Sequence, residues 1–284
     1  TARWCSAASD FPPSTMLVNG ASGHSIAIRD RGLLYGDGVF RTFRVVQGKA
    51  QHWPLHYQKL LNDCAALGIT CPARAALDAE LAELIARHPD GIFKLIITRG
   101  EGVRGYAPPT QAHPSRLWDV APLPTYPPDW ATGGVTLHLC DMRLAQQPRL
   151  AGIKHLNRLE NVLAAAEWRA PEIAEGLLRD TADNVIEGTR SNLFMVRKGA
   201  LITPDLSQCG VAGVQRERVM AWAAAQGVAC HVASFGLAAL FEADEIFLVN
   251  SVIGLWPVRE LQQHRWTHYP MAERIRESLS HAPD

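Results

Sequence analysis

The sequence has no excess of charge of either sign, because 28 lysine and arginine residues balance 28 aspartate and glutamate residues. A chain with no formal net charge has no general electrostatic reason to bind nucleic acid or an anionic membrane. It also lacks any uninterrupted apolar run near the ~20 residues that cross a bilayer. We therefore expect a soluble, cytoplasmic protein with neither a nucleic acid nor a membrane as its partner.

Cysteine spacings typical of metal or redox sites are absent. The six cysteines never form a Cys-x-x-Cys motif: Cys5, Cys64, Cys71, Cys140, Cys209 and Cys230. Isolated reduced thiols suit a cytosolic chain of this length better than a disulfide framework does. The pairs His52/His56 and His264/His268 have i, i+4 spacing, but Pro54 interrupts the first pair and neither pair has a third ligand. We expect no metal site.

Two familiar nucleotide-binding motifs are incomplete or missing. Gly100-Glu101-Gly102 begins like a dinucleotide fingerprint but lacks the third glycine, and no P-loop is present. The sequence therefore does not match either nucleotide-binding motif.

The composition is that of an ordinary globular protein, with 47% hydrophobic and 20% charged residues. A length of 284 residues allows one large domain or two modest ones. Four prolines lie between residues 119 and 129, and proline stiffens an extended chain. We predict an α+β protein with an N-terminal extension (1–15), a small domain (16–118), a proline-rich linker (119–129) and a large domain (130–284).

Local patterns predict several elements. Pro54 suits the first turn of a helix and Gly68 suits its C-terminal cap. The Lys198-Gly199 pair is typical of a hairpin turn. Apolar spacing predicts further helices over 73–87, 156–169 and 214–226, and strands over 16–18, 92–98, 135–139, 176–181, 191–196, 200–203 and 245–249.

Lys154 and Glu187 are candidate chemical groups. A lysine at the edge of a buried element is desolvated, which favours a nucleophilic amine that forms a Schiff base with an aldehyde. Most lysines at such positions are simply solvated, and that alternative stays open. Glu187 stands between Val185-Ile186 and Gly188, where burial requires a cationic partner. A protonated heterocyclic nitrogen is one possible partner, and Arg190 in the same turn is the other.

Several motifs acquire meaning from their order along the chain. They are Arg31–Phe40, His56–Leu60, Lys154–Asn157, Glu187–Phe194, Gly213-Val214 and Asn250-Ser251. Together they resemble the fold-type IV pyridoxal-phosphate enzymes, the branched-chain aminotransferase-like family, from Leu17 to about Pro257. The resemblance implies two domains, a smaller N-terminal α/β domain and a larger, mixed and barrel-like C-terminal domain. It also implies pyridoxal 5'-phosphate as the cofactor and a homodimer.

The resemblance assigns roles at the reactive end of the cofactor. Lys154 would bind the cofactor covalently. Glu187 would face its pyridine nitrogen and keep it protonated, so that the ring accepts electrons. Arg158 is expected among the cofactor-binding residues.

The phosphate end of the cofactor is assigned in the same way. Val214 and Gln215 would offer backbone N–H groups at a helix N-terminus, and Ser251 would add a hydroxyl. Gln215 stands where threonine or methionine is more usual. Lys59 stands where the family usually has a phosphate-binding arginine, so the charge is kept but the bidentate fork is lost.

Within the family, residues 97–108 and 150–160 resemble most the 4-amino-4-deoxychorismate lyases, which eliminate pyruvate from aminodeoxychorismate to give 4-aminobenzoate. By this resemblance, Arg104 would bind a substrate carboxylate, and Tyr35 and Tyr106 would line the pocket. Arg104 as an ordinary loop arginine remains an alternative.

Two other functions stay open. An aminotransferase of D-amino acids or branched-chain amino acids would use the same Lys154 and Glu187. The D-amino-acid enzymes tend to have Arg-x-His where this chain has Arg104-Gly105-Tyr106, which favours the lyase. A non-catalytic scaffold of the same fold is the remote alternative, and only Lys59 favours it.

Overall fold

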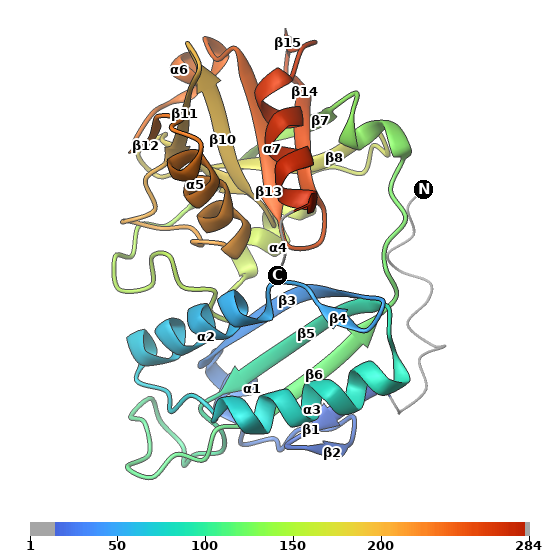
Figure 1. Cartoon of the computed structure of the whole chain (residues 1–284). Helices are drawn as coiled ribbons and strands as arrows, with labels where there is room; N and C mark the ends of the chain where they lie inside the picture. Colours follow the sequence, from blue (N-terminus) through green and yellow to red (C-terminus); the bar gives the residue numbers. More distant parts are fainter. Residues whose placement is uncertain (1–14, 282–284) are drawn as a thin grey trace. The chain divides into compact units, whose positions relative to one another are not determined.

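The structure is a computed structural model that describes residues 15–281 (Figure 1). All but the last residue of the expected N-terminal extension lie outside this range. The chain divides into two compact units. Among the described residues, the first unit contains 15–124 together with Lys154–Asn157, and the second contains Thr125–Ile153 and 158–281.

The first unit is built on a six-stranded antiparallel sheet in the order β2-β1-β6-β5-β3-β4. Its helices α2 and α3 lie on the same face of this sheet (Figure 1). The strands are β1 (Met16–Val18), β2 (Ala21–Ser22), β3 (Gly38–Val46), β4 (Lys49–Ala50), β5 (Gly91–Thr98) and β6 (Arg116–Ala121), and the helices are α1 (Arg31–Tyr35), α2 (Trp53–Leu67) and α3 (Arg74–Arg87).

Helix α2 packs against β3 through aromatic side chains. Alternate residues of β3 are fully buried, as expected for a strand with one face toward a core. The Phe43 ring lies 5.2 Å from both Trp53 and His56 of α2, measured between ring centroids. Proline at the start of α2 and the left-handed Gly68 (φ 63°) at its end agree with the sequence prediction. This packing fixes the side of α2 that faces β3.

The second unit contains a nine-stranded sheet in the order β12-β11-β10-β13-β14-β7-β8-β9 with β15 beside β14. Because β9 also pairs with β10, the run from β10 to β9 closes on itself as a barrel. The strands are β7 (Val135–Leu144), β8 (Ile173–Asp180), β9 (Val185–Gly188), β10 (Asn192–Arg197), β11 (Ala200–Pro204), β12 (Cys230–Ala233), β13 (Glu245–Asn250), β14 (Gly254–Leu261) and β15 (His264–Arg265).

Helices α5 and α7 pack against β13 and against each other (Figure 1). The core beneath them contains the stacked rings of Phe194 and Phe247, 5.2 Å apart. The helical segments of this unit are η2 (Pro128–Ala131), α4 (Leu159–Ala165), α5 (Val214–Ala225), α6 (Leu237–Phe241) and α7 (Pro270–His281). Within residues 15–281, none of the helices combines the length and the apolar character needed to span a membrane.

The predicted helix over 156–169 is wrong in extent, because α4 covers only Leu159–Ala165. The preceding residues instead extend along β3, where His155 bridges to Val39 and the N–H of Leu156 donates to the carbonyl of Gly38. Residues that pair with a strand in this way cannot form helical hydrogen bonds. Strand β6 takes up residues 119–121 and η2 begins at Pro128, so 122–127 connect the two elements.

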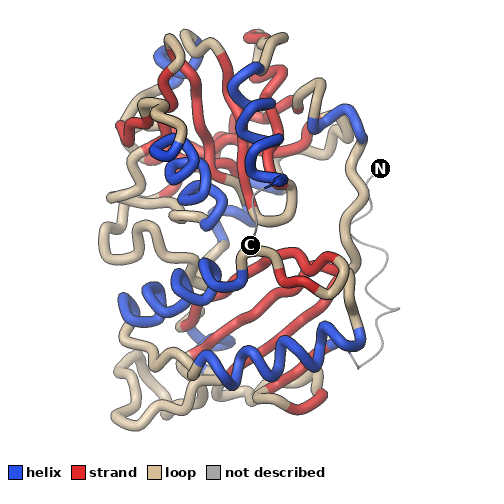
Figure 2. Tube along the Cα trace, viewed as in Figure 1, coloured by secondary structure: helices blue, strands red, loops and turns tan. Residues whose placement is uncertain are grey.

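The longest stretch between regular elements of the first unit follows β5. Residues 99–115 contain neither a helix nor a strand of the sheet, and Figure 2 shows them as loop. This loop contains Arg104 and Tyr106. Its conformation therefore depends on tertiary contacts.

Candidate active site

Lys154 belongs to an extended segment that lies along β3. The backbone N–H of Phe40 donates to the carbonyl of Lys154 at 3.0 Å, and the Lys154 Nζ lies 4.5 Å from the centroid of the Phe40 ring. Gly38 makes this approach possible. A Cβ atom there would lie 2.5 Å from the carbonyl oxygen of Ile97 and 2.8 Å from a methyl of Leu156, so any side chain would displace the segment.

A buried carboxylate lies beside the backbone of Lys154. Asp63, on α2, accepts a hydrogen bond from the Lys154 N–H at 3.0 Å. The same carboxylate forms ion pairs with Arg41 of β3 and with Lys59, one helical turn earlier. Asp63 and Arg41 are each only 2% exposed, and burial lowers the pKa of Arg41 to about 9. One carboxylate therefore links α2, β3 and the Lys154 segment.

Lys59 is 15% exposed and its amine contacts Asp63. The position where the family resemblance places a phosphate-binding arginine is thus occupied by a cation already oriented by a neighbour. Arg41 and Lys59 together exceed Asp63 by one positive charge. A cluster with that charge fits a phosphate group better than it fits a cation.

Tyr35 and Tyr106 are brought together by the loop after β5. Their ring centroids lie 5.3 Å apart, and the Tyr35 hydroxyl accepts the N–H of Gly105 at 3.3 Å. Arg31 fixes the loop backbone by donating to the carbonyls of Gly105 (3.0 Å), Tyr106 (2.8 Å) and Ala107 (3.3 Å). The loop conformation therefore depends on one buried guanidinium.

Arg31 is itself held by Asp37, whose carboxylate lies 2.8 Å from its Nε. Asp37 also accepts two hydrogen bonds from Arg99, at 2.8 and 3.1 Å. Burial raises the pKa of Asp37, but the hydrogen bonds and charges of Arg99 and Arg31 outweigh it and lower the pKa overall. Arg104 is exposed and forms no hydrogen bond or ion pair with any residue in 15–281. Its role stays a prediction.

Glu187 lies in the second unit, where β9 pairs with β10. It is 3% exposed. Its Oε2 accepts the backbone N–H of Val211 at 2.8 Å and lies 3.5 Å from the side-chain amide of Asn192. Arg190, the alternative partner considered from the sequence, pairs with Glu175 at 3.4 Å and donates to the carbonyl of Ala174.

Arg158 lies just before α4 and is partly buried. Its guanidinium donates to the carbonyl of Ile153 at 3.3 Å and to the side chain of Asn161 at 3.4 Å. Burial lowers the pKa of Arg158, while the negative charges of Glu187 and Glu160 act in the opposite direction. The structure therefore brings Arg158 into the electrostatic field of Glu187.

The N-terminus of α5 has no side-chain cap at Gly213. Val214 and Gln215 are buried in its first turn, and the Gln215 side chain accepts a hydrogen bond from Arg218. Asn192 accepts the Gly213 N–H at 3.1 Å. The first N–H groups of a helix without a side-chain cap form a donor set that suits a phosphate.

Ser251 follows β13 in a turn that Asn250 stabilises. The Asn250 side chain accepts the N–H groups of Val252 and Ile253, each at 2.8 Å, and donates to the carbonyl of Arg190. The sequence prediction named Ser251 but gave Asn250 and Asn192 no separate role. It also missed Asp63 and Arg41. The available indication was a single acidic and a single basic residue, each among mostly apolar neighbours in the sequence.

The donor groups of each unit fit part of pyridoxal 5'-phosphate. The first unit offers a primary amine beside a cluster with an excess of positive charge. The second offers a buried carboxylate held by two neutral donors and an uncapped helix N-terminus. Among the described residues, no cluster of three or more histidine, cysteine, aspartate or glutamate side chains could hold a metal ion.

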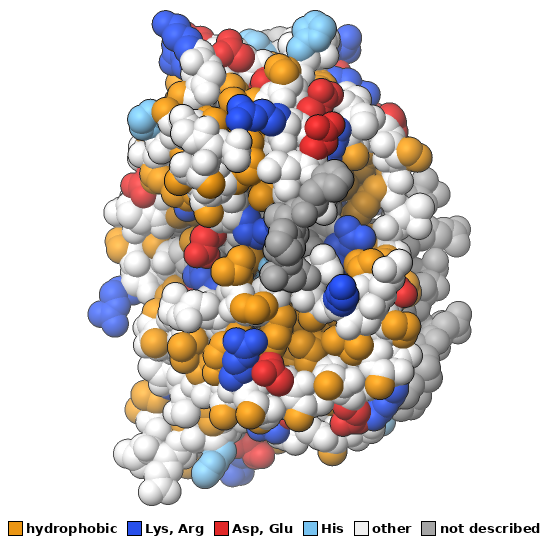
Figure 3. All heavy atoms as spheres, viewed as in Figure 1, with side chains coloured by type: hydrophobic (Ala, Val, Ile, Leu, Met, Phe, Trp, Pro, Cys, Tyr) orange, Lys and Arg blue, Asp and Glu red, His pale blue; other side chains and the backbone are white. Residues whose placement is uncertain are grey.

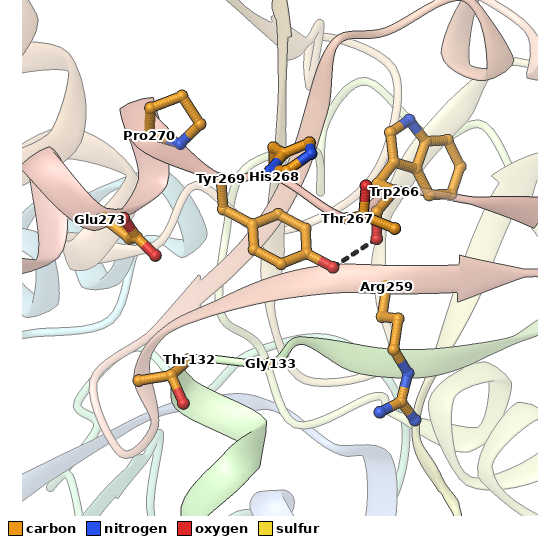
Figure 4. A pocket seen from close by; sticks show the side chains of 9 residues that line it. All are labelled: Thr132, Gly133, Arg259, Trp266, Thr267, His268, Tyr269, Pro270 and Glu273. Carbon is orange, nitrogen blue, oxygen red and sulfur yellow. Dashed lines mark hydrogen bonds between the residues drawn. The ribbon is translucent and has the colours of Figure 1, made fainter.

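A separate surface pocket of about 610 Å³ lies in the second unit near the start of α7 (Figure 4). Tyr269 is among its lining residues, and its hydroxyl donates to the Trp266 carbonyl at 2.5 Å (Figure 4). None of the predicted site residues lines this pocket. Figure 3 shows acidic and basic side chains interspersed over the visible face, in keeping with the zero formal net charge.

Comparison with known proteins gives a consistent result. The chain is 37% identical over 242 residues to an aminodeoxychorismate lyase of Vibrio harveyi, covering 85% of this chain and 89% of that protein. The crystal structure of 4-amino-4-deoxychorismate lyase from Pseudomonas aeruginosa superposes with a TM-score of 0.90 at 45% identity, covering 93% and 97% of the two chains.

A hypothetical aminotransferase from Mycobacterium tuberculosis, solved in its PLP-bound form, has the same fold, with a TM-score of 0.80 at 22% identity over 93% of this chain and 97% of that one. These likenesses confirm the predicted fold class. The family model described as amino-transferase class IV matches residues 38–261. The chain therefore belongs to the class IV aminotransferase family.

Proposed function

We propose that the chain is a pyridoxal-phosphate-dependent 4-amino-4-deoxychorismate lyase, which converts aminodeoxychorismate to 4-aminobenzoate and pyruvate in folate biosynthesis. The observation on which this rests is the similarity to aminodeoxychorismate lyases, in sequence and in fold, over most of the chain. The Arg104-Gly105-Tyr106 run supports the lyase over a D-amino-acid aminotransferase.

Lys154 is the residue that binds the cofactor covalently in this proposal. Its amine is the type of group that condenses with an aldehyde. The carbonyl of Lys154 accepts the backbone N–H of Phe40, which ties the segment that carries this amine to β3. When bound, the cofactor supplies an electron-withdrawing ring that stabilises negative charge on the substrate carbon.

Lys154 also moves the proton. The Lys154 Nζ would act as the base that takes the proton from the substrate ring carbon that bears the amine. The carbon–oxygen bond to the enolpyruvyl group then breaks and the ring becomes aromatic. Lys154, or a water in its place, would return a proton to the departing enolpyruvyl group, which becomes pyruvate, so that the proton taken from the ring carbon is balanced by the one in the product.

Glu187 and Arg158 act at the pyridine nitrogen. Glu187 accepts a hydrogen bond from the protonated nitrogen, while Val211 and Asn192 hold its carboxylate in place. The negative charge of Glu187 interacts favourably with the guanidinium of Arg158. An ionised Glu187 is needed to keep the nitrogen protonated.

In each unit, one kind of donor is assigned to the phosphate group. Lys59 supplies positive charge, and the backbone N–H groups of Val214 and Gln215 supply the donors of a helix N-terminus. Ser251 adds a hydroxyl from the turn that Asn250 stabilises. The first unit is thus assigned the positive charge and the second the N–H and hydroxyl donors, because these are the groups that each unit contains.

Substrate recognition is assigned to the loop after β5. Arg104 binds a substrate carboxylate, and Tyr35 and Tyr106 line the pocket. The exposed position of Arg104 on a loop held by Arg31 supports this role, because a guanidinium free of protein partners among residues 15–281 is available to a ligand.

A homodimer in the cytoplasm completes the proposal. Exposed apolar side chains of the first unit, among them Leu33, Leu34, Val103 and Tyr106, offer a surface for a second copy. The described cysteines are all free, as is usual in a reducing compartment. Light scattering after size-exclusion chromatography tests the dimer, and a monomer at micromolar concentration would contradict it.

Covalent attachment is tested by adding pyridoxal phosphate, reducing with borohydride and mapping the labelled peptide by mass spectrometry. We expect the label on Lys154 and its loss in Lys154→Ala. Lys94→Ala is the matched control, because the Lys94 amine also lies over the Phe40 ring, 5.4 Å from its centroid. A label on Lys94 in the wild-type protein would contradict the proposal.

The reaction is tested with two substrates given separately. Aminodeoxychorismate should yield pyruvate and 4-aminobenzoate in equal amounts without any amino acceptor. D-Alanine with 2-oxoglutarate tests the aminotransferase alternative. Strong D-glutamate production without any 4-aminobenzoate would overturn the lyase assignment.

A further inference from the structure

The charge cluster beside Lys154 points to a role that the catalytic scheme does not use. Asp63 lies on α2, Arg41 on β3 and Lys154 on the extended segment, and all three belong to the first unit. Asp63 contacts each of the others, and it also contacts Lys59.

We propose that Asp63 is a positioning residue that fixes the backbone of Lys154, with Arg41 as the buried counter-charge that keeps the carboxylate in place. This inference rests on the proposed function, because it assigns Asp63 to the placement of the reactive amine. It concerns residues for which the family resemblance provided no role.

Burial makes this arrangement specific. A carboxylate that is 2% exposed is stable only with charged or hydrogen-bonding partners, and a guanidinium that is 2% exposed has the same need. Arg41 and Asp63 therefore require each other. The ion pair leaves the carboxylate in one orientation, from which its Oδ2 accepts both Arg41 and the Lys154 N–H.

The consequence for Lys154 is that both of its polar backbone atoms are held by hydrogen bonds. Asp63 accepts the N–H at 3.0 Å, and Phe40 donates to the carbonyl at 3.0 Å. The side chain then extends from a backbone that is restrained on both sides of the Cα atom. The amine is assigned two roles, as the point of covalent attachment and as the base. A restrained backbone limits the positions that the amine can adopt, which favours both roles.

Lys59 is joined to the same carboxylate. Its amine contacts Asp63 Oδ1, while the Lys154 N–H uses Oδ2. The cation assigned to the phosphate and the residue assigned to the aldehyde are therefore placed by the two oxygens of one side chain. A shift of Asp63 would therefore move both Lys59 and Lys154.

A pair of double variants tests the hydrogen bond apart from the charge. Arg41→Met with Asp63→Asn removes both charges but keeps an oxygen that accepts the Lys154 N–H. Arg41→Met with Asp63→Ala removes both charges and the acceptor. Replacing both members of the Arg41–Asp63 pair avoids leaving either of these two buried charges without the other, so both variants are expected to fold. Lys59, which is 15% exposed, loses the same charged partner in both variants, so the comparison between them is unaffected.

The readout is amide hydrogen exchange at Lys154 in the cofactor-free protein. We expect exchange to be about tenfold faster in the alanine variant than in the asparagine variant, the factor that corresponds to about one hydrogen bond. Glu80→Ala is the control, because Glu80 is a buried carboxylate of the same unit that pairs with Arg116 and Trp118 instead. It should destabilise the fold without changing exchange at Lys154.

The second readout is the dissociation constant of pyridoxal phosphate. It should be about tenfold higher for the alanine variant than for the asparagine variant. Equal exchange rates at Lys154 in the two variants would overturn the proposal, and so would unequal exchange with equal affinity. Failure of the proposed function is seen separately, as a cofactor that attaches elsewhere than Lys154 in the wild-type protein.

Discussion

Glu187 and Asn192 are paired across β9 and β10, the pairing through which the sheet of the second unit closes on itself. The Asn192 amide lies 3.5 Å from the Glu187 carboxylate, donates to the carbonyl of Val211 at 2.7 Å and accepts the N–H of Gly213. One side chain thus joins the closure of the barrel, the acid assigned to the cofactor ring and the residue that begins α5. Changes at either residue should therefore separate structural from chemical effects.

Asn192→Ala should destabilise the protein by about 1–3 kcal/mol, because the buried carbonyl of Val211 and the N–H of Gly213 lose their partner. The midpoint of urea unfolding measures this. Asn62→Ala, at an exposed position on α2, serves as the comparison and should change stability little. Equal stability of the two variants would show that the Asn192 contacts contribute nothing.

Glu187→Gln should leave the free energy of unfolding close to that of the wild type, because an amide oxygen still accepts the Val211 N–H. It should lower kcat by about 100-fold or more, since a neutral amide does not keep the ring nitrogen protonated. Steady-state kinetics at saturating cofactor measure kcat. Wild-type activity in this variant would remove Glu187 from the ring-nitrogen role.

Lys59→Met should weaken the binding of pyridoxal phosphate by about tenfold, because a charged hydrogen bond to phosphate is lost. Binding of pyridoxal, which has no phosphate, should be unchanged and is the matched control ligand. Equal loss for both ligands would mean that Lys59 acts on the fold of α2 through Asp63 and not on the phosphate.

Arg31→Met should raise KM for the substrate by about tenfold without changing cofactor affinity. The loop carbonyls of Gly105, Tyr106 and Ala107 lose their donor, so Arg104 is no longer held toward the substrate. Arg29→Met tests whether any nearby arginine would do, because its side chain forms no hydrogen bond or ion pair with residues 15–281. A change in cofactor affinity for Arg31→Met would contradict the assignment of this loop to the substrate alone.

Asp37→Asn should remove a pH-dependent part of the stability. The folded pKa of Asp37 lies below its ordinary value of 3.8, because the hydrogen bonds from Arg99 and Arg31 outweigh the effect of burial. Ionised Asp37 therefore stabilises the fold fully above pH 3.8, and this contribution is lost as the pH falls through the folded value. The difference between wild type and variant should shrink on acidification, as measured by urea unfolding at a series of pH values.

Glu245→Gln should change the pH dependence of stability in the opposite direction. Burial raises the pKa of Glu245 above 4.5, so the folded state binds the proton more tightly and loses stability as the pH rises through the folded pKa. The amide variant should lack that loss. A variant that follows the wild-type curve would show that Glu245 titrates alike in the folded and unfolded chains.

Local residues predicted those parts of the fold that depend on a few neighbours. Pro54 and Gly68 mark the ends of α2, and Lys198-Gly199 forms the turn between β10 and β11 with φ of 52° and 78°. These positions are set by ring closure at proline and by the low cost of the left-handed region at glycine. The order of the sequence motifs likewise predicted the family to which the chain belongs.

The same reasoning failed where a distant segment competes with a local preference. Apolar spacing predicted a helix from 156, but residues 155 and 156 pair with β3, so α4 begins at Leu159. The contact between Asp63 and the Lys154 N–H spans 91 residues, and nothing near either residue indicates it. Strands β3 and β14 and helix α7 were not assigned from the sequence.

The sequence by itself determined which chemical groups are present, where turns and helix ends fall, and which family the chain belongs to. The tertiary structure decided which buried carboxylate pairs with which cation. Asp63 pairs with Arg41 and Lys59, and Arg190 pairs with Glu175 and not with Glu187. The physical reason is the distance along the chain over which each interaction acts. Backbone preferences act over a few residues, whereas the pairing of buried charges depends on which segments exclude water together, and that is settled only when the whole unit packs.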